Sequence, residues 1–153
     1  MLLMVIVISV CGLGFAGYLA NNVLARDTGT DAMRVVSDAI KEGAEAFLRR
    51  QNRTIALLSI AVAALIMVSY GVIVGNVEQG VTTTVGFLLG AFCSGLAGYI
   101  GMWVSIRTNI RTASAARHSM NSALQASFRG GAVSGVTVVA MSMLGVGGFF
   151  GAL

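Results

Sequence analysis

The acidic side chains of this chain are few, and most of them lie in one segment. Five of the six come before residue 46, and they are Asp27, Asp31, Asp38, Glu42 and Glu45. Carboxylate oxygens are the ligands that Mg²⁺ prefers, so divalent-cation binding is the chemistry this group could support. Their spacing follows the solvated face of a helix, however, and no paired aspartates stand among them. We therefore expect no catalytic, cofactor-binding or metal-binding residue here.

A second charged segment is basic and contains no carboxylate. It connects two long apolar runs, and its cations are Arg107, Arg111, Arg117 and Arg129. Arginine is costly in hydrocarbon, so these residues indicate a connection outside a membrane. We expect Arg111 and Arg129 to serve structurally, in helix packing or as interface anchors whose side chains snorkel. Contact of Arg129 with phosphate-bearing lipid is the alternative, and the lone His118 is expected to be solvated.

Composition places the chain in a membrane. Of 153 residues, 56% are hydrophobic and only 10% are charged, whereas a soluble domain carries about 25% charged residues. The net charge of +4 does not indicate nucleic-acid binding, because no basic face with stacking aromatics accompanies it. Cys11 and Cys93 both fall in apolar runs and are expected to be packing residues.

Four apolar stretches predict membrane spans, at residues 2–20, 55–74, 85–106 and 130–153. Each approaches or exceeds the roughly 20 residues that cross a bilayer core. The first could be a signal peptide, but it lacks a basic leading region and is long, so a retained helix is favoured. The sequence thus predicts an all-α membrane protein with four transmembrane helices.

The basic residues predict the orientation of these spans. All ten Lys and Arg side chains lie in the connections 26–53 and 107–129, whereas the connection between spans two and three carries only Glu78. Short basic connections stay on the cytoplasmic side. We expect both basic loops to be cytoplasmic and both termini to face the opposite side of a cell membrane.

Residues 31–51 predict an additional cytoplasmic amphipathic helix. Met33, Val36, Ile40, Ala44 and Phe47 recur at helical spacing, with charged residues between them. A helical extension of the second span is the favoured interpretation. An interfacial or partner-binding helix is the alternative.

Small residues four positions apart predict close helix packing. They include Gly90, Gly98 and Gly101 in the third span and Gly131 and Gly135 in the fourth. Such stripes let helix backbones approach closely in lipid. The pattern G-x-G-x-x-G at residues 12–17 lies inside an apolar span rather than a βαβ unit, so it too indicates packing and not nucleotide binding.

Several short motifs together resemble the membrane-bound inorganic pyrophosphatases, the pyrophosphate-energised ion pumps. They are Gly90-Ala, Ser94-x-x-Ala-Gly, Gly101-Met, Asn109-x-Arg111-Thr112, Ser127-Phe-Arg-Gly-Gly-Ala-Val-Ser-Gly135 and Ile40-Lys-Glu-Gly-Ala-Glu-Ala-Phe-Leu-Arg49. The chain departs from the family's usual basic–acidic–tyrosine run at Arg50-Gln51-Asn52.

The resemblance implies a larger helical bundle of which this chain is the first part. Those pumps couple pyrophosphate hydrolysis to proton or sodium export, use Mg²⁺ and form homodimers. The family's acidic substrate motifs are absent from this chain, and its first four helices belong to an outer ring. The resemblance therefore implies an N-terminal fragment or partial gene model that binds no cofactor and is inactive alone, with the bilayer, the pump's remaining helices and pyrophosphate as partners of the whole protein.

Two other classes of protein remain open at this point. One is a small four-helix membrane scaffold or assembly protein without catalysis. The other is a small transporter subunit, against which the lack of an ionisable side chain inside any predicted span argues.

Overall fold

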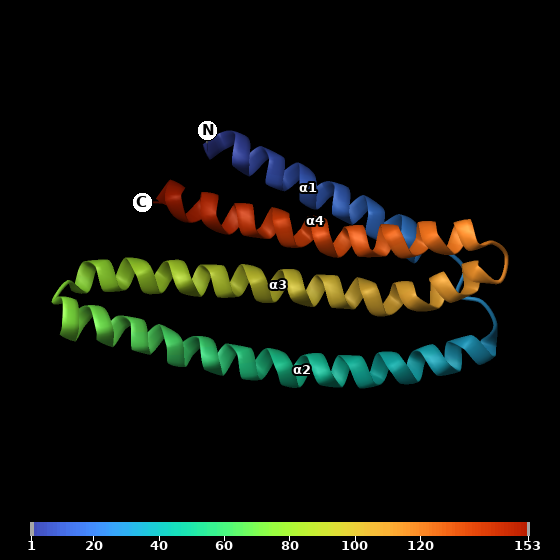
Figure 1. Ribbon diagram of the computed structural model, residues 1–153, viewed down its shortest axis with the longest axis horizontal. Helices are drawn as coiled ribbons and strands as arrows, with labels where there is room; N and C mark the ends of the chain where they lie inside the picture. Colours follow the sequence, from blue (N-terminus) through green and yellow to red (C-terminus); the bar gives the residue numbers. More distant parts are fainter. Residues whose placement is uncertain (1, 153) are drawn as a thin grey trace.

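The computed structural model describes residues 2–152, and every regular element within them is a helix (Figure 1). The elements are α1 (Leu2–Leu24), α2 (Asp31–Val68), the π-helical segment η1 (Ser69–Val74), α3 (Val77–Ala116) and α4 (Met120–Ala152).

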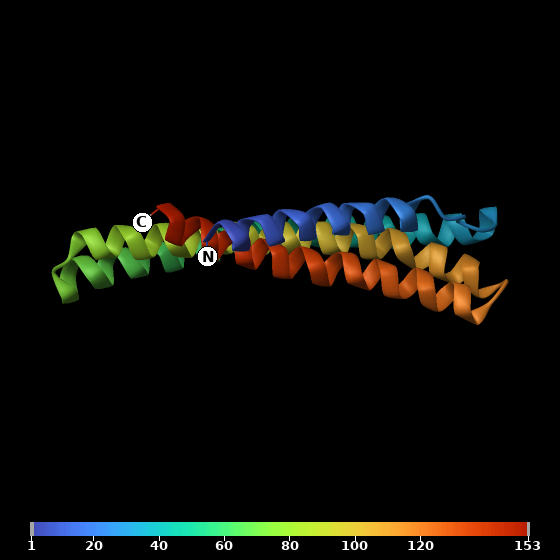
Figure 2. The same ribbon diagram turned by 90° about the horizontal axis from the view of Figure 1, so that it is seen from above.

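The helices lie side by side in the spatial order α1, α4, α3, α2 (Figure 1). Helix α4 packs against both α1 and α3, and α3 packs against α2, whereas α1 and α2 do not pack on each other within the described residues. Seen from above, the four helices form a thin layer rather than a rounded bundle (Figure 2). Each helix therefore keeps much of its surface free of the others.

All four helices are long and apolar enough to cross a membrane. Large apolar side chains are exposed along each of them, for example Ile8, Leu65, Phe92 and Val139. In lipid such side chains need no cover from water, so their exposure is compatible with a stable fold. The predicted all-α membrane fold with four spanning helices is confirmed.

The two basic connections are mostly helical. Only residues 25–30 separate α1 from α2, and only residues 117–119 separate α3 from α4. The amphipathic helix of residues 31–51 runs without a break into the second span, as the extension interpretation predicts. Backbone hydrogen bonding continues past the apolar stretch because nothing interrupts it, and the chain contains no proline. The limits of the spans themselves stay a prediction.

The turn between α2 and α3 is tight because two residues there have special backbone roles. Gly75 adopts φ +71°, a left-handed conformation that favours glycine. The side-chain Oδ1 of Asn76 then accepts a hydrogen bond of 3.1 Å from the backbone N–H of Gln79, capping α3. The hairpin of α2 and α3 follows from these two residues.

The core lies where α1, α3 and α4 meet. Ala16 and Leu19 of α1 pack with Val104 of α3 and Val133 of α4. The side chain of Trp103 is partly buried against this cluster. Small and branched side chains fill the centre, so the three helix backbones lie close together.

Glycines make the seam between α3 and α4 narrow. A Cβ added at Gly101 would lie 3.1 Å from Oγ of Ser134, whose hydroxyl donates a hydrogen bond of 3.2 Å to the Gly101 carbonyl. A Cβ at Gly130 would lie 2.8 Å from Oγ1 and 3.0 Å from Cβ of Thr108. At Gly130 a side chain would therefore displace Thr108, and at Gly101 it would press on Ser134.

The other four glycines named from the sequence have open space at the position of a Cβ, among the residues described. A Cβ added at Gly90, Gly98, Gly131 or Gly135 would meet no atom of another residue within 4 Å among those described. Among the residues described, Gly101 is the one of these five predicted packing glycines whose added Cβ would meet another helix. Contact of the other four with a helix from outside residues 2–152 stays a prediction.

The neighbours Gly130 and Gly131 provide a matched test of this seam. Gly130→Ala should destabilise the chain by ~1–3 kcal/mol, because Thr108 is stiff at χ1 and cannot move aside easily. Gly131→Ala should be neutral or stabilising, since alanine is the better helix former. Thermal unfolding in detergent measures both, and a Gly130→Ala variant at least as stable as Gly131→Ala would contradict this account of the seam.

Candidate functional site

The sequence-predicted anchor Arg111 reaches the carboxyl end of α1. Its Nε and Nη2 atoms donate hydrogen bonds of 3.1 and 2.8 Å to the carbonyl oxygen of Leu24. Its Nη1 atom donates a further bond of 2.6 Å to the Arg107 carbonyl, one turn earlier in α3. One guanidinium therefore joins the last residue of α1 to α3.

This contact satisfies two needs of a helix end at once. The last carbonyls of a helix have no intrahelical donor, and the helix dipole places partial negative charge there. The arginine guanidinium meets both needs, because it is positively charged and presents several N–H donors in one plane. The contact is thus a carboxyl-terminal cap supplied by a residue far away in the sequence.

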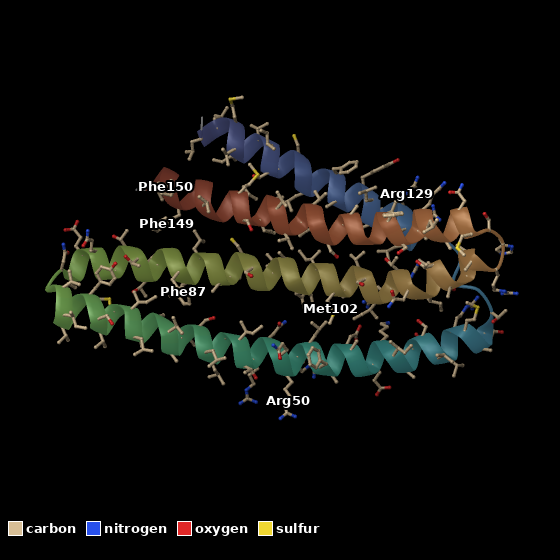
Figure 3. The ribbon with its side chains drawn as sticks, viewed as in Figure 1. Arg50, Phe87, Met102, Arg129, Phe149 and Phe150 are labelled. Atoms are coloured by element: carbon tan, nitrogen blue, oxygen red, sulfur yellow. The ribbon has the colours of Figure 1, made fainter. Side chains whose placement is uncertain are left out.

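Two more arginines tie the same end of α1 to α4. Arg129 of α4 donates from Nη1 to Oδ1 of Asn22 in α1, where the two helices converge (Figure 3). Arg26, just after α1, donates from Nη1 to the carbonyl oxygen of Ser122 at 3.2 Å. We call Arg26, Arg111 and Arg129 the arginine clamp.

The charge of Arg111 lies in an unfavourable setting apart from these bonds. Burial lowers the pKa of Arg111, and the neighbouring charge of Arg107 lowers it further. Arginine nevertheless stays protonated in proteins, so the clamp keeps its charge at any physiological pH.

Asp27 closes the turn after α1. Its Oδ2 atom accepts hydrogen bonds from Oγ of Ser114 and from the backbone N–H of Gly29, both at 3.1 Å. The Ser114 bond is the main cause that lowers the pKa of Asp27, and the Gly29 bond adds to it. A lowered pKa means that this contact stabilises the fold at neutral pH and is lost as the pH falls through that pKa.

Arg107 forms a second polar cluster, between α2 and α3. Its guanidinium carbon lies 3.8 Å from the ring centroid of Trp103. Its Nη2 atom pairs with Oε1 of Glu45 in α2 at 3.1 Å. The Trp103 ring and the Glu45 carboxylate together hold the side chain of Arg107 between α2 and α3.

Sequence reasoning named two members of these clusters but not their partners. Arg111 and Arg129 were expected as structural residues, whereas their partners Leu24 and Asn22 were missed. The contacts of Asp27 with Ser114 and of Trp103 with Arg107 were missed as well. The only local signal was Asp27-Thr-Gly29, the pattern of a turn in which an aspartate accepts from a backbone two residues on. His118 is exposed at the turn before α4.

The acidic side chains of the described residues do not gather in one place. No group of three or more His, Cys, Asp or Glu side chains gathers within residues 2–152. Asp31, Asp38, Glu42 and Glu45 are all exposed along one helix, α2.

The clamp predicts the effect of removing Arg111. Arg111→Gln should destabilise the chain by about 1.5–3 kcal/mol, the usual contribution of hydrogen bonds to a charged group. Arg50→Gln is the matched control, because Arg50 is exposed and points away from the other helices (Figure 3). Thermal unfolding in detergent compares them, and equal melting temperatures for the two variants would refute the cap.

Comparison with known proteins identifies the family. The family described as inorganic H+ pyrophosphatase matches residues 10–153. A K(+)-insensitive pyrophosphate-energized proton pump 2 of Moorella thermoacetica is 47% identical over 133 residues, which is 87% of this chain and 18% of that protein. No solved structure matches.

Archaeal and plant proteins show the same relation. A K(+)-insensitive pyrophosphate-energized proton pump of Methanosarcina mazei is 41% identical over 90% of this chain. A pyrophosphate-energized membrane proton pump 3 of Arabidopsis thaliana is 42% identical over 94% of it. The chain spans about a fifth of the length of these relatives, 20% in both cases. With the family match covering nearly the whole sequence, this chain belongs to the inorganic H+ pyrophosphatase family.

Proposed function

We propose that this chain is the N-terminal, outer part of a membrane pump that couples pyrophosphate hydrolysis to proton export. The observation that carries the proposal is its similarity, over 87–94% of its length, to three proteins named as pyrophosphate-energized proton pumps. That similarity favours the pump over a free-standing four-helix scaffold. Two of these relatives are named K(+)-insensitive, and we propose the same insensitivity here.

Within such a pump the described residues have a structural task. The arginine clamp fixes the end of α1 against α3 and α4, and the glycine seam sets the distance between α3 and α4. We propose that pyrophosphate and its Mg²⁺ are bound by residues outside 2–152. The open faces at Gly90 and Gly98 would then receive other helices of the pump, which is proposed to be a homodimer.

The proposal predicts a division of activity between the whole pump and this part of it. In vesicles that contain the full-length protein, pyrophosphate with Mg²⁺ should drive acidification of the lumen, and K⁺ should not change the rate. Vesicles with the 153-residue chain alone should release no phosphate, since two or more metal ions need a carboxylate cluster to hold them.

A pH-sensitive dye and a phosphate assay measure the two activities, with protein-free vesicles and a protonophore as controls. Pyrophosphate hydrolysis without acidification by the full-length protein would contradict the pumping function. Magnesium-dependent hydrolysis by the 153-residue chain would contradict the division.

We further propose that both basic connections face the cytoplasm, in the cell membrane. The two turns that test this lie at opposite ends of the molecule, one before α3 and the other before α4 (Figure 1). In a cysteine-free background, Glu78→Cys should react with an impermeant maleimide on intact cells, whereas Arg117→Cys should react only after the cells are opened. The reverse labelling pattern would refute this orientation.

A further inference from the structure

A long groove runs between α2 and α3, formed by three cavities in succession. The first has a volume of about 230 Å³ and the second about 370 Å³, and they share Ile106 and Arg107 in their walls. The second and the third, of about 430 Å³, share Asn52 and Tyr99. We call this row of adjoining cavities the α2–α3 groove.

The character of the groove changes along its length. Its first cavity is lined by four cations, Arg34, Lys41, Arg107 and Arg111, and by one carboxylate, Asp38, among the described residues. Its middle cavity carries the aromatic rings of Tyr99 and Trp103, together with Arg49 and the ion pair of Arg107 and Glu45. Its last cavity is lined mainly by apolar side chains, among them Ile55, Ile60, Leu88, Phe92 and Leu96.

The cations of the first cavity are only partly neutralised. Arg34 pairs with Asp31 at 3.4 Å and Arg107 pairs with Glu45 at 3.1 Å. Among residues 2–152, neither Lys41 nor Arg111 has a carboxylate within 4.0 Å, and both face this cavity. Burial and the repulsion from Arg107 both lower the pKa of Arg111. An anion beside Arg111 would favour its charged form and so offset both effects.

This order of basic, aromatic and apolar walls matches the order of parts in a phospholipid. Tryptophan and tyrosine favour the level of the headgroups, and basic pockets between spanning helices bind phosphate headgroups. From Trp103 to Phe92 the helix α3 rises about 16 Å, which is close to the ~15 Å hydrocarbon depth of one leaflet. A free phosphate would fill only the first cavity. A packed apolar helix would leave the cations of the first cavity without a counter-ion.

We propose that the α2–α3 groove binds an anionic phospholipid, with its phosphate beside Lys41 and Arg111, its glycerol backbone near Trp103 and an acyl chain along Phe92 and Leu96. The site depends on the chain crossing a membrane but not on pyrophosphate hydrolysis.

Trp103 permits a direct test, because it is the one tryptophan in the sequence and lies between the two halves of the site. The 153-residue chain in detergent is titrated with phosphatidylglycerol whose acyl chains are brominated, and quenching of tryptophan fluorescence is measured. Brominated phosphatidylcholine of the same chain length is the comparison. We expect half-maximal quenching at severalfold lower phosphatidylglycerol than phosphatidylcholine, and equal midpoints would overturn the proposal.

Charge-matched variants locate the headgroup. Lys41→Gln should raise the phosphatidylglycerol midpoint about fivefold, the effect expected for one basic residue near an anionic headgroup. Arg50→Gln removes the same charge from the same helix, but Arg50 points away from the groove (Figure 3) and should leave the midpoint unchanged. An equal shift in both variants would reveal attraction to the surface in general and would overturn the site.

Two further measurements separate a headgroup contact from misfolding and from binding of a soluble anion. Lys41→Arg keeps the charge and should keep the wild-type midpoint, which separates loss of the headgroup contact from misfolding of Lys41→Gln. Inorganic phosphate at constant ionic strength should not reverse the quenching. Reversal by millimolar phosphate would assign the first cavity to a soluble anion and overturn the lipid proposal.

Discussion

The end of α1 is the constraint on which the arrangement of this chain depends. Helix α1 carries few polar groups along its length, so its contact with α4 is mainly van der Waals packing, which is less directional than hydrogen bonding. Its last carbonyl and the turn that follows are different, because each unmet polar group near hydrocarbon is costly. Arg111 of α3 donates to the last carbonyl of α1, and Arg129 of α4 donates to the side chain of Asn22 near that end. Arg26, in the turn, donates in the other direction, to the Ser122 carbonyl of α4. The polar end therefore sets the register that the apolar packing then follows.

The small residues act through distance rather than through chemistry. Gly101 and Gly130 allow α3 and α4 to approach until Ser134 and Thr108 touch the opposite helix. Close approach multiplies dispersion contacts, which are the main attraction left between helices in lipid. The open stripe at Gly90 and Gly98 has the same composition without such a partner. Small residues in the sequence thus indicate where another helix can approach closely, but they do not indicate which helix approaches.

The fold was largely predictable from sequence, because apolar length and the placement of charge are local properties. The four spanning helices follow from apolar length, and the helical extension at residues 31–51 follows from its periodicity. The partners of the arginines were not predictable, since Arg111 and Leu24 are 87 positions apart and Arg129 and Asn22 are 107 apart. Their meeting depends on how the helices cross. The cavities between α2 and α3 were unpredictable for the same reason, although Lys41, Trp103 and Phe92 were each visible in the sequence.

The absence of packing between α1 and α2 within residues 2–152 bears on how the chain assembles during synthesis. Helix α1 is made before α3 and α4, the two helices that hold it, so among these four helices it has no packing partner until they are made. The hairpin of α2 and α3 has only short-range contacts to close and can form at once. Helix α1 docks when α4 emerges and completes its binding surface. The order of translation and the order of docking therefore differ, and the earliest-made of these four helices is among the last of them to be fixed.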